Sequence, residues 1–218
     1  SILKARKIIS EFKPDIAIGV GGYASGPLLR TASSMGIKTL IQEQNSYPGI
    51  TNKILSKKAE KICVAYDNLE SFFPKEKIVL TGNPVRAEVT QIQNKKVEAF
   101  NHFELNSNKP VLLVIGGSLG ALTINKAIEK FAESLTASGL QIIWQTGKNF
   151  KSERAHTLPG VHAHTFIKEM DFAYAAADII VSRAGAMSIS ELCLVKKPCI
   201  LVPSPNVSED HQTKNAMA

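Results

Sequence analysis

Short apolar runs, many rich in β-branched residues, alternate along the chain with longer stretches whose apolar residues recur at helical spacing. Such runs, bounded by glycine, proline and polar residues, predict buried strands. The predicted strands are Ile16–Val20, Thr39–Gln42, Ile62–Ala65, Ile78–Leu80, Val111–Ile115, Ile142–Gln145, Val161–Phe166, Ile179–Ser182 and Cys199–Val202. The helices predicted between them include Pro27–Met35, Thr123–Ser134, Asp171–Ala176 and Met187–Val195. This alternation predicts an α/β protein with parallel sheets and helices on both faces of each sheet.

One long segment, residues 83–110, interrupts the alternation, because it is polar, rich in lysine and asparagine, and closed by Pro110. We interpret it as a linker with a surface helix and place a domain boundary near Arg86. The prediction is therefore two doubly wound units, residues 1–86 and 87–218, that face each other across a cleft. Ligands of open α/β sheets bind beyond the carboxyl ends of the strands, so the loops that leave the strands are the candidates for chemistry.

Composition narrows the class of partner. Hydrophobic residues make up 44% of the chain and charged residues 21%, which is typical of a globular protein. The formal net charge of +7 and the sequence pI near 9.3 favour an anionic partner, such as a nucleic acid, a phosphorylated metabolite or an acidic membrane surface. The lysines are dispersed, and neither a zinc-finger spacing nor an RNA-binding aromatic motif is present, so we expect no nucleic acid.

The cysteines and the hydropathy indicate the compartment. Cys63, Cys193 and Cys199 are odd in number and lie in apolar stretches, which predicts reduced core thiols of a cytoplasmic protein. No apolar run approaches the roughly 18 residues that span a bilayer, so any membrane contact should be peripheral. Because the chain starts at Ser1 and ends within a helix-like stretch, we expect a piece of a longer protein.

The first glycine-rich turn, "GVGGYASGP" at residues 19–27, follows the predicted strand Ile16–Val20. Glycine lets the backbone approach a phosphate closely, and a helix start offers unpaired N–H groups and a partial positive charge. The same residues are equally typical of a tight strand-to-helix turn, so this stretch alone leaves both interpretations open.

The second turn, Gly116–Gly120, lies between a strand and an amphipathic helix in "VLLVIGGSLGALTIN". It is not the dinucleotide fingerprint, and Trp144 and Gln145 stand where an acidic residue would end the next strand, which argues against NAD. A Gly-Gly-Ser turn can still bind a diphosphate through backbone N–H groups and the Ser118 hydroxyl.

The third turn is "SRAGAMSISE" at residues 182–191. Ser188 and Glu191 have the spacing of a capping box, which predicts that they begin the helix Ile189–Val195. This interpretation leaves Arg183 unexplained, because a guanidinium at the end of a buried strand costs desolvation unless an anion or a carboxylate meets it.

Polar side chains follow two further strands. The stretch "TGNPVR" puts Arg86 at the predicted hinge, where it is either a surface charge or a group that grips a phosphate across the cleft. The stretch "QEQNSYPG", residues 42–49, carries amides and a carboxylate that suit the hydroxyl and amide groups of a sugar.

Two other patterns have ordinary interpretations. His162 and His164 alternate along one strand, and two such residues without a third ligand are more typical of a solvated face than of a metal site. The lysines of "TNKILSKKAEK", residues 51–61, are more typical of a solvated helix face than of a membrane-binding one.

Six motifs taken together resemble one family. "GVGGYASGP", "QEQN", "TGNPVR", "GGSLGA", "SRAGAMSISE" and "DHQTKNA" occur in the order and spacing of the bacterial N-acetylglucosamine transferases of peptidoglycan synthesis. The resemblance runs from about Lys13 to the end of the chain. It implies inverting transfer of GlcNAc from UDP-GlcNAc to lipid I, undecaprenyl-diphosphate-MurNAc-pentapeptide, which forms lipid II. The implied location is peripheral, at the anionic cytoplasmic face of the bacterial inner membrane.

The resemblance also implies the GT-B fold, with two Rossmann-like doubly wound domains facing a cleft. Residues 1–86 would form the carboxyl-terminal half of the acceptor-side domain, and residues 87–218 most of the domain that binds the UDP-sugar. The fold would be incomplete at both termini, as in a central fragment.

The family implies a role for each donor-binding residue. Arg86 and Ser118 would contact the UDP diphosphate, and the backbone of Ile167 would hold the uracil. Met187 and Ser188 would lie against the phosphates at a helix start.

The sugar and acceptor contacts implied by the family come from both halves of the chain. Glu191 would accept hydrogen bonds from the ribose hydroxyls, and Gln212 and Asn45 would contact the GlcNAc. The residues implied on the acceptor side, near the lipid diphosphate, are Gly21, Gly22, Tyr23 and Ser25.

The chain departs from the family at the catalytic base. The family's first turn, "GGTGGH", carries the favoured base in its histidine and is absent here, so the base is unknown and we expect the fragment to be inactive alone. The family's "HEQN" reads "QEQN", with Gln42 in place of histidine.

Helix starts and Arg86 can stabilise the departing UDP, and no paired-aspartate motif is present, so we expect neither a metal nor a cofactor.

Two alternative functions stay open. A UDP-GlcNAc 2-epimerase has the same architecture but should carry acidic and histidine residues where this chain has glycine turns. A non-catalytic nucleotide-sugar-binding subunit would depend on a partner chain for catalysis, which fits the absence of "GGTGGH".

Overall fold

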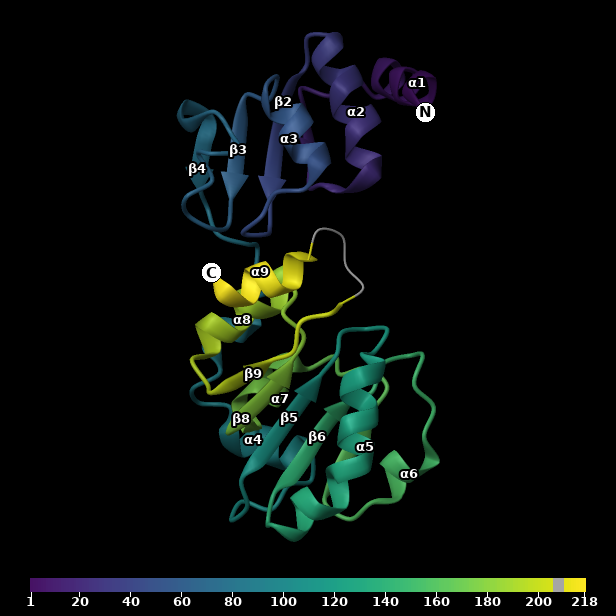
Figure 1. The fold of residues 1–218 in the computed structure, drawn as a ribbon, viewed down its shortest axis with the longest axis vertical. Helices are drawn as coiled ribbons and strands as arrows, with labels where there is room; N and C mark the ends of the chain where they lie inside the picture. The colour runs from purple at the N-terminus through teal and green to yellow at the C-terminus, as the bar shows by residue number, and fades with distance from the viewer. Residues whose placement is uncertain (206–209) are drawn as a thin grey trace. The chain divides into compact units, whose positions relative to one another are not determined.

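Nine strands in the described residues, 1–205 and 210–218 of the computed structural model, form two separate sheets (Figure 1). Every strand pair in both sheets is parallel, as the alternation of strands and helices predicted. Contacts divide the chain into unit 1, which contains Ser1–Pro84 and the described residues 210–218, and unit 2, Val85–Pro205.

Unit 1 has a four-stranded sheet in the order β1-β2-β3-β4. Its strands are β1 Ile16–Gly19, β2 Lys38–Glu43, β3 Lys61–Val64 and β4 Ile78–Leu80. Its helices are α1 Ile2–Phe12, α2 Gly22–Ser34, α3 Ile50–Ser56 and α9 His211–Met217, with the 3-10 turn η1 Lys75–Lys77.

The core of unit 1 lies on one face of its sheet. Ile41 and Ile62 are paired neighbours on β2 and β3, are fully buried, and pack with Leu29 of α2. On β1, Ile16 and Ile18 are exposed because they point to the other face. Among the described residues, helices therefore cover one face of this sheet, in contrast to the prediction that both faces are covered.

Unit 2 has a five-stranded sheet in the order β7-β6-β5-β8-β9. Its strands are β5 Val111–Ile115, β6 Gln141–Gln145, β7 Val161–His164, β8 Ile179–Ser182 and β9 Cys199–Leu201. Its helices are α4 Lys96–His102, α5 Leu122–Ala137, α6 Glu153–Thr157, α7 Met170–Ala176 and α8 Ala186–Val195, with the 3-10 turn η2 Ala87–Gln91. The predicted strand 161–166 ends at His164 instead.

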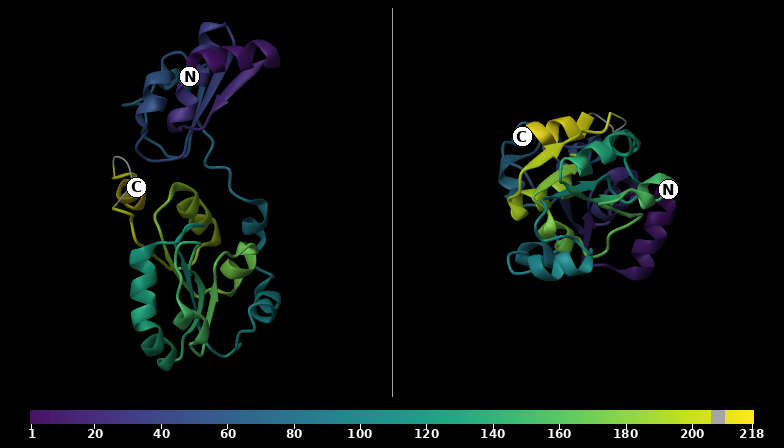
Figure 2. Two further views of the ribbon diagram at one scale, coloured as in Figure 1. Left: turned by 90° about the vertical axis from the view of Figure 1, so that its right-hand side faces the viewer. Right: turned by 90° about the horizontal axis from the view of Figure 1, so that it is seen from below.

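Helices cover both faces of the sheet of unit 2, as predicted. Leu113 and Ile180 face one core, which includes Tyr174 of α7, whereas Val114 and Trp144 face a second core beneath α5. The left view of Figure 2 shows the teal α5 on one side of this sheet and α4 on the other. Burial on both faces explains why β5 and β6 are continuously apolar and not alternating.

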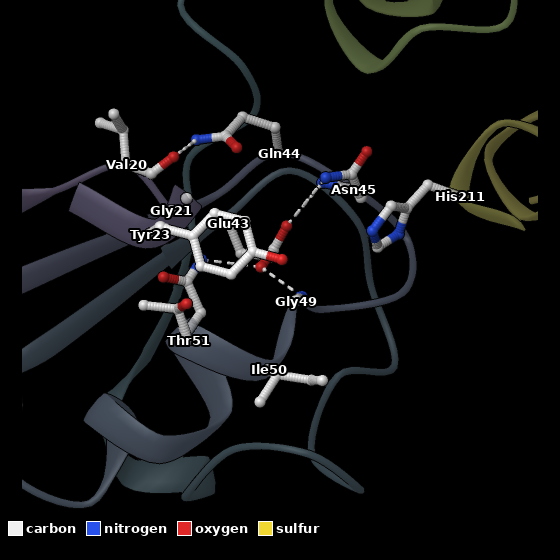
Figure 3. Close-up of a pocket in the computed structure, with 12 residues that line it drawn as sticks. Val20, Gly21, Tyr23, Glu43, Gln44, Asn45, Gly49, Ile50, Thr51 and His211 are labelled. Carbon is white, nitrogen blue, oxygen red and sulfur yellow. Dashed lines mark hydrogen bonds between the residues drawn. The ribbon is translucent and has the colours of Figure 1, made fainter. Parts of the chain in front are cut away.

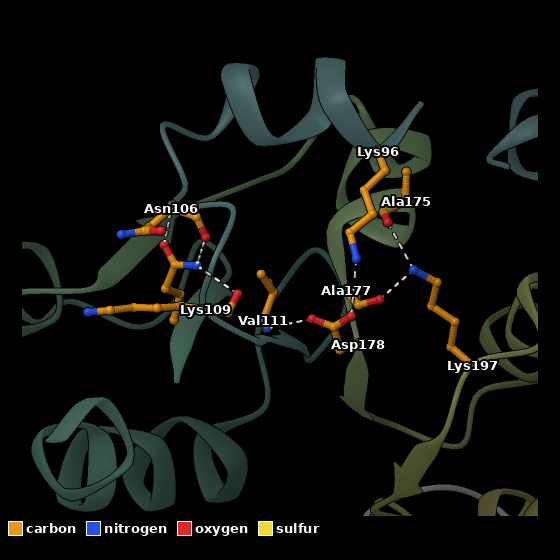
Figure 4. A network of polar contacts seen from close by, with 9 residues as sticks. Lys96, Asn106, Lys109, Val111, Ala175, Ala177, Asp178 and Lys197 are labelled. Carbon is orange, nitrogen blue, oxygen red and sulfur yellow. Dashed lines mark hydrogen bonds and ion pairs between the residues drawn. The ribbon is translucent and has the colours of Figure 1, made fainter. Parts of the chain in front are cut away.

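A polar network holds the end of unit 2 at which β5 and β8 begin (Figure 4). Asp178 accepts a hydrogen bond of 2.8 Å from the backbone N–H of Val111 and pairs with Lys96 at 3.4 Å. Lys197 donates to the carbonyl oxygens of Ala175 and Ala177, where α7 ends. Burial lowers the pKa of Lys197, although Asp178 nearby opposes that shift. These contacts fix the sheet at the end away from the loops that follow β5 and β8.

The carboxyl-terminal helix groups by its contacts with the first unit, whereas the sequence-based division placed it with residues 87–218. Residues 210–218 group with unit 1 and not with unit 2. Asn215 of α9 is buried, and its Oδ1 accepts hydrogen bonds from the N–H and Oγ of Ser46, at 2.9 and 3.2 Å. Its Nδ2 donates to Oδ1 of Asn45 at 3.0 Å. These bonds tie the helix to the loop that follows β2.

Candidate functional site

The strand order of unit 2 locates a site at the carboxyl ends of β5 and β8. The chain runs from β5 outward to β6 and β7, then returns to place β8 on the other side of β5. Helices that follow β5 and β8 therefore leave toward opposite faces, which opens a crevice between the two loops. Ile115 and Ser182 end these strands as direct neighbours in the register. The Gly116–Gly120 turn and the 183–188 turn thus begin side by side.

The turn after β5 needs glycine at two positions. Gly117 and Gly120 have φ of +82° and +86°, in the left-handed region that residues with a side chain rarely adopt. A Cβ atom on Gly120 would lie 2.2 Å from the carbonyl oxygen of Thr146, whereas one on Gly117 would meet nothing within 4 Å. Ser118 lies between them and is exposed, so its hydroxyl is available to a ligand.

Gln145 links this turn to Ile167. Its side chain is buried at the end of β6. Its Nε2 donates to the carbonyl oxygen of Gly117 at 3.2 Å, and its Oε1 accepts from the N–H of Ile167 at 2.9 Å. The N–H of Ile167 is therefore occupied. Its carbonyl oxygen accepts no hydrogen bond within the part of the chain that the structure describes, so it is the backbone group of Ile167 that remains for a ligand.

Arg183 has protein partners in place of an anion. Its Nη1 donates to the carbonyl oxygens of Val202 and Pro203 at 3.1 and 2.9 Å, and its Nη2 donates to Oγ1 of Thr123 at 2.7 Å. Burial lowers its pKa. Arg183 thus ties the end of β8 to the loop after β9 and to the first turn of α5. The expectation that an anion or a carboxylate must meet this guanidinium is wrong.

The helix after β8 begins earlier than the capping-box interpretation requires. Helix α8 starts at Ala186, its N-cap is Gly185, and no side chain caps it. Ser188 therefore lies inside the first turn, and the capping box is wrong. The first N–H groups of an α-helix have no partner within the helix, and the partial positive charge at this end favours an anion.

Glu191, one turn further along α8, is held by two donors. Arg86 donates from Nε to Oε1 at 3.1 Å, and from Nη2 to Oε1 and Oε2 at 3.0 and 3.2 Å. Tyr174 of α7 donates from its hydroxyl to Oε2 at 2.8 Å. The Glu191 side chain is only 10% exposed, whereas that of Arg86 is 49% exposed. Two predicted donor-site residues are therefore partners of each other.

Tyr174 is a permanent donor in this cluster. Burial raises the pKa of its hydroxyl far above the usual value, and the adjacent Glu191 carboxylate raises it further. The hydroxyl therefore stays protonated, and Oε2 of Glu191 keeps this partner at any physiological pH.

A second candidate site is a pocket of about 370 Å³ in unit 1 (Figure 3). Gly21, Gly22 and Tyr23 line it at the start of α2, where both glycines have positive φ. Tyr23 is 95% exposed. Ser25, predicted beside them, is buried and donates its hydroxyl hydrogen bond to the carbonyl oxygen of Gly21, so it stabilises the helix start from within.

Glu43 organises the wall of this pocket. It is buried at the end of β2 and accepts hydrogen bonds from the N–H and Nδ2 of Asn45, both at 3.1 Å. It also accepts from the N–H of Gly49 at 3.2 Å and from Nδ2 of Asn52 at 2.7 Å. Figure 3 shows the Glu43 carboxylate with its hydrogen bonds to Asn45 and Gly49 as dashed lines. A buried carboxylate with this many donors holds the loop 44–49 in one conformation.

Gln42, which stands where the motif "HEQN" has histidine, forms a hydrogen bond with Asn83. Its Nε2 donates to Oδ1 of Asn83 at 3.0 Å, and Asn83 Nδ2 donates to the carbonyl oxygen of Gln44 at 3.1 Å. This chain of bonds joins the end of β2 to the loop that follows β4.

The two histidines that the sequence analysis singled out do not form a metal site in the described residues. His162 and His164 are half-buried, and burial lowers the pKa of each. Over residues 1–205 and 210–218, no group of three or more His, Cys, Asp and Glu side chains is placed to hold a metal ion.

Cys193 and Cys199 are exposed and Cys63 is partly exposed, so the prediction of core thiols is wrong. Periodicity could not show which side of a short apolar run faces the core.

The predicted residues fall into two groups. Unit 2 contains Arg86, Ser118, Ile167, Met187, Ser188 and Glu191. Unit 1 contains Asn45, Gln212 and the four predicted acceptor-side residues. Sequence reasoning missed Gln145 and Tyr174. A polar residue at the end of an apolar strand and a tyrosine within a buried helix are the signals that could have found them.

Comparison with known proteins identifies the family that this chain is similar to. The model of the glycosyltransferase family 28 C-terminal domain matches residues 111–218, and that of the N-terminal domain of the same family matches residues 1–64. A protein of Parabacteroides distasonis is 58% identical over the whole of this chain, and one of Cytophaga hutchinsonii is also 58% identical over the whole chain. Both are named UDP-N-acetylglucosamine–N-acetylmuramyl-(pentapeptide) pyrophosphoryl-undecaprenol N-acetylglucosamine transferase. The chain spans 61% and 59% of their lengths.

Solved structures share the fold. The crystal structure of Acinetobacter baumannii MurG matches 99% of this chain with a TM-score of 0.73 and 29% identity, and the chain covers 60% of that protein. A UDP-GlcNAc 2-epimerase of Neisseria meningitidis matches 97% of the chain, which covers 65% of it, with a TM-score of 0.68 but only 14% identity, so that likeness shows the fold alone. The architecture is thus the Rossmann-like GT-B fold, as the resemblance implied.

Proposed function

The chain belongs to glycosyltransferase family 28, and we propose that it transfers GlcNAc from UDP-GlcNAc to lipid I, which forms lipid II for peptidoglycan synthesis. In the proposed inverting reaction, an acceptor hydroxyl attacks the anomeric carbon, its proton passes to a base, and the bond to the UDP oxygen breaks. The departing UDP gains negative charge, so positive groups fixed around the diphosphate lower the barrier.

The observation that carries this proposal concerns two turns in unit 2, each of which leads into a helix. They follow the neighbouring strands β5 and β8, where the strand order of the sheet reverses. The Gly116–Gly120 turn and the uncapped start of α8 follow neighbouring strand ends. Both offer backbone N–H groups to an anion, and Glu191 lies one turn beyond the second. This arrangement suits a nucleoside diphosphate, with the diphosphate at the turns and the ribose at the carboxylate.

Each part of the donor then has a proposed partner. Ser118, Met187 and Ser188 hold the diphosphate together with Arg86, and Glu191 accepts from the ribose hydroxyls. The carbonyl oxygen of Ile167 accepts from N3–H of uracil, which is supported by the occupation of its N–H by Gln145.

The remaining partners of the proposed reaction lie in unit 1. Asn45 and Gln212 contact the GlcNAc, while Gly21, Gly22, Tyr23 and Ser25 accommodate the diphosphate of lipid I. The Ser25 contribution is indirect, because its hydroxyl is bonded to Gly21.

We also propose peripheral attachment to the anionic cytoplasmic face of the inner membrane. The net charge of +7 supports attraction to acidic lipids. No helix in the described residues combines the length and apolarity needed to cross a bilayer.

Binding of UDP-GlcNAc to variants of the full chain tests the donor site. We expect Glu191→Ala and Arg86→Ala to weaken binding at least tenfold, since a hydrogen bond to a charged group is worth about 1.5–3 kcal/mol. His162→Ala, on β7, is the control and should leave the affinity unchanged. Isothermal titration calorimetry measures all three, with UDP-glucose as the competing sugar nucleotide that should bind more weakly. Equal losses in the three variants would remove the assignment of the donor site to α8.

A further inference from the structure

The carboxylate of Glu191 has no acceptor position left for a ribose hydroxyl. A carboxylate offers about four lone-pair sites. Arg86 fills three of them and Tyr174 the fourth, at distances of 2.8 to 3.2 Å. A ribose hydroxyl can therefore bind Glu191 only if one of these donors leaves.

The donor that can leave is Arg86. Tyr174 is 1% exposed and lies in the core that also contains Leu192 of α8, so its hydroxyl cannot leave Glu191 without repacking of that core. The Arg86 side chain is 49% exposed. Its guanidinium can turn toward solvent or toward an anion while the backbone of η2 stays in place.

A diphosphate at the start of α8 gives that guanidinium a better partner. Side chains three residues apart on a helix are about 5–6 Å apart at Cβ, so the Ser188 turn is adjacent to the Arg86–Glu191 pair. A guanidinium binds phosphate oxygens in the same forked geometry as a carboxylate, and a diphosphate carries more charge. When the Arg86 guanidinium leaves Glu191, it can therefore bind the diphosphate.

We propose that Arg86 blocks the ribose-binding side of Glu191 until a diphosphate draws it away, so that the site selects nucleoside diphosphates over nucleosides. This inference rests on the proposed function, because it takes UDP as the ligand of this site. A ligand without phosphates must compete with Arg86, and its apparent affinity falls by the fraction of molecules in which Glu191 is free. A diphosphate removes that penalty, and ribose and phosphate recognition become coupled.

The coupling predicts opposite effects of one substitution on two ligands. In the full chain, Arg86→Ala should weaken UDP binding by roughly tenfold or more, because a charge-assisted contact to the diphosphate is lost. The same variant should strengthen uridine binding by roughly two- to fivefold. This factor corresponds to the free energy of a partly exposed ion pair, because Arg86 no longer competes with the ribose hydroxyls for Glu191. Calorimetry measures UDP, and ligand-observed NMR titration measures uridine.

Two further variants make the result specific. Arg154→Ala removes a matched arginine that pairs with Glu133 at 2.8 Å on the surface of unit 2, and it should change neither affinity. Arg86→Lys keeps the charge without the fork, so it should recover part of the UDP affinity while still binding uridine better than the unaltered chain does. Thermal unfolding of each variant verifies that unit 2 is folded.

The outcomes separate this inference from the proposed function. Opposite changes for UDP and uridine support it. If uridine binding weakens or stays constant while UDP binding falls, Arg86 is a simple ligand or a scaffold, and the blocking role is wrong. If the unaltered chain binds neither UDP nor UDP-GlcNAc, the proposed function itself fails.

Discussion

Tyr174 shows how a buried neutral side chain can set the position of a charged one. Its hydroxyl donates to Oε2 of Glu191, and Glu191 lies on a different helix. Without this donor, the carboxylate would have only the partly exposed Arg86 to orient it. In the proposed donor site, Tyr174 is therefore a positioning residue, which would act on the ribose through Glu191.

Replacing Tyr174 by phenylalanine should weaken UDP binding by roughly tenfold, the value of about one hydrogen bond to a carboxylate. The cause is misplacement of Glu191, so the loss should depend on the ribose hydroxyls. Calorimetry with UDP and with 2′,3′-dideoxy-UDP measures this dependence: UDP should lose affinity in the variant, whereas the dideoxy compound should bind equally well to both proteins.

Tyr47→Phe is the matched control, because Tyr47 packs against Phe72 in unit 1. It should alter neither affinity. A parallel loss for UDP and its dideoxy analogue in Tyr174→Phe would indicate a general loosening of unit 2 and contradict the positioning role.

Residue-scale prediction failed where the partners of a side chain come from distant segments of the chain. Arg183 looked like an anion ligand because its desolvation had no visible compensation. The compensation comes from the carbonyl oxygens of Val202 and Pro203 and from the hydroxyl of Thr123, about 20 and 60 residues away in the chain. No local pattern contains that information.

At the scale of elements, the turn after β5 depends on close packing against the turn after β6. Gly120 lies against the carbonyl of Thr146, and Asn125 of α5 donates to the same carbonyl oxygen at 2.7 Å. Trp144 in turn donates from Nε1 to Oδ1 of Asn125 at 3.0 Å. The Gly116–Gly120 turn is thus anchored to the core through the buried amide of Asn125.

Gly120→Ala should therefore destabilise unit 2 by about 2 kcal/mol or more, because left-handed strain of about 1–2 kcal/mol is added to a backbone collision. The same change should weaken UDP binding, since the turn must shift to relieve the collision. Chemical denaturation and calorimetry measure the two effects.

Gly117→Ala is the matched control for that substitution. Gly117 has a nearly equal φ, +82° against +86°, but a Cβ there has open space around it. Its cost should be the backbone strain alone, about 1–2 kcal/mol, and smaller than the cost of Gly120→Ala. If the two variants unfold at the same denaturant concentration, the contact between Gly120 and Thr146 is not what holds the turn.

The nine strands were predicted within two residues at each end, because they are short apolar runs that end in glycine or polar turns. Helical periodicity, which predicts Met187–Val195, missed the start of α8 by one residue, whereas the capping-box interpretation missed it by three. Ser188 and Glu191 have the spacing of a capping box, yet the backbone turns at Gly185, where the absence of a side chain leaves no signal of a cap.

At the scale of the whole molecule, sequence order did not reveal which unit the last helix joins. The family model of the C-terminal domain includes residues 111–218, but α9 bonds through Asn215 to the loop after β2 in unit 1. The pairing depends on a buried amide that meets Ser46 and Asn45 nearly the whole chain length away, which periodicity cannot encode. Gln212 on this helix and Asn45 therefore belong to one unit.

This division predicts different protection by two ligands. UDP carries only the groups proposed to bind unit 2, so it should slow hydrogen exchange in the Gly116–Gly120 turn and the first turn of α8. UDP-GlcNAc adds the sugar, and it should also slow exchange in residues 43–52 and 211–217, where Asn45 and Gln212 lie. Ligand binding stabilises the segments it contacts by about 2.7 kcal/mol at a hundredfold excess over Kd, which hydrogen–deuterium exchange mass spectrometry detects readily.

ADP, a diphosphate with the wrong base, is the control ligand and should protect neither set of segments at the same concentration. Protection of 43–52 by UDP alone would mean that unit 1 contacts the nucleotide and not the sugar. No added protection by UDP-GlcNAc would remove Asn45 and Gln212 from the donor site, because a sugar held by their amides must slow the opening of the backbone that carries them.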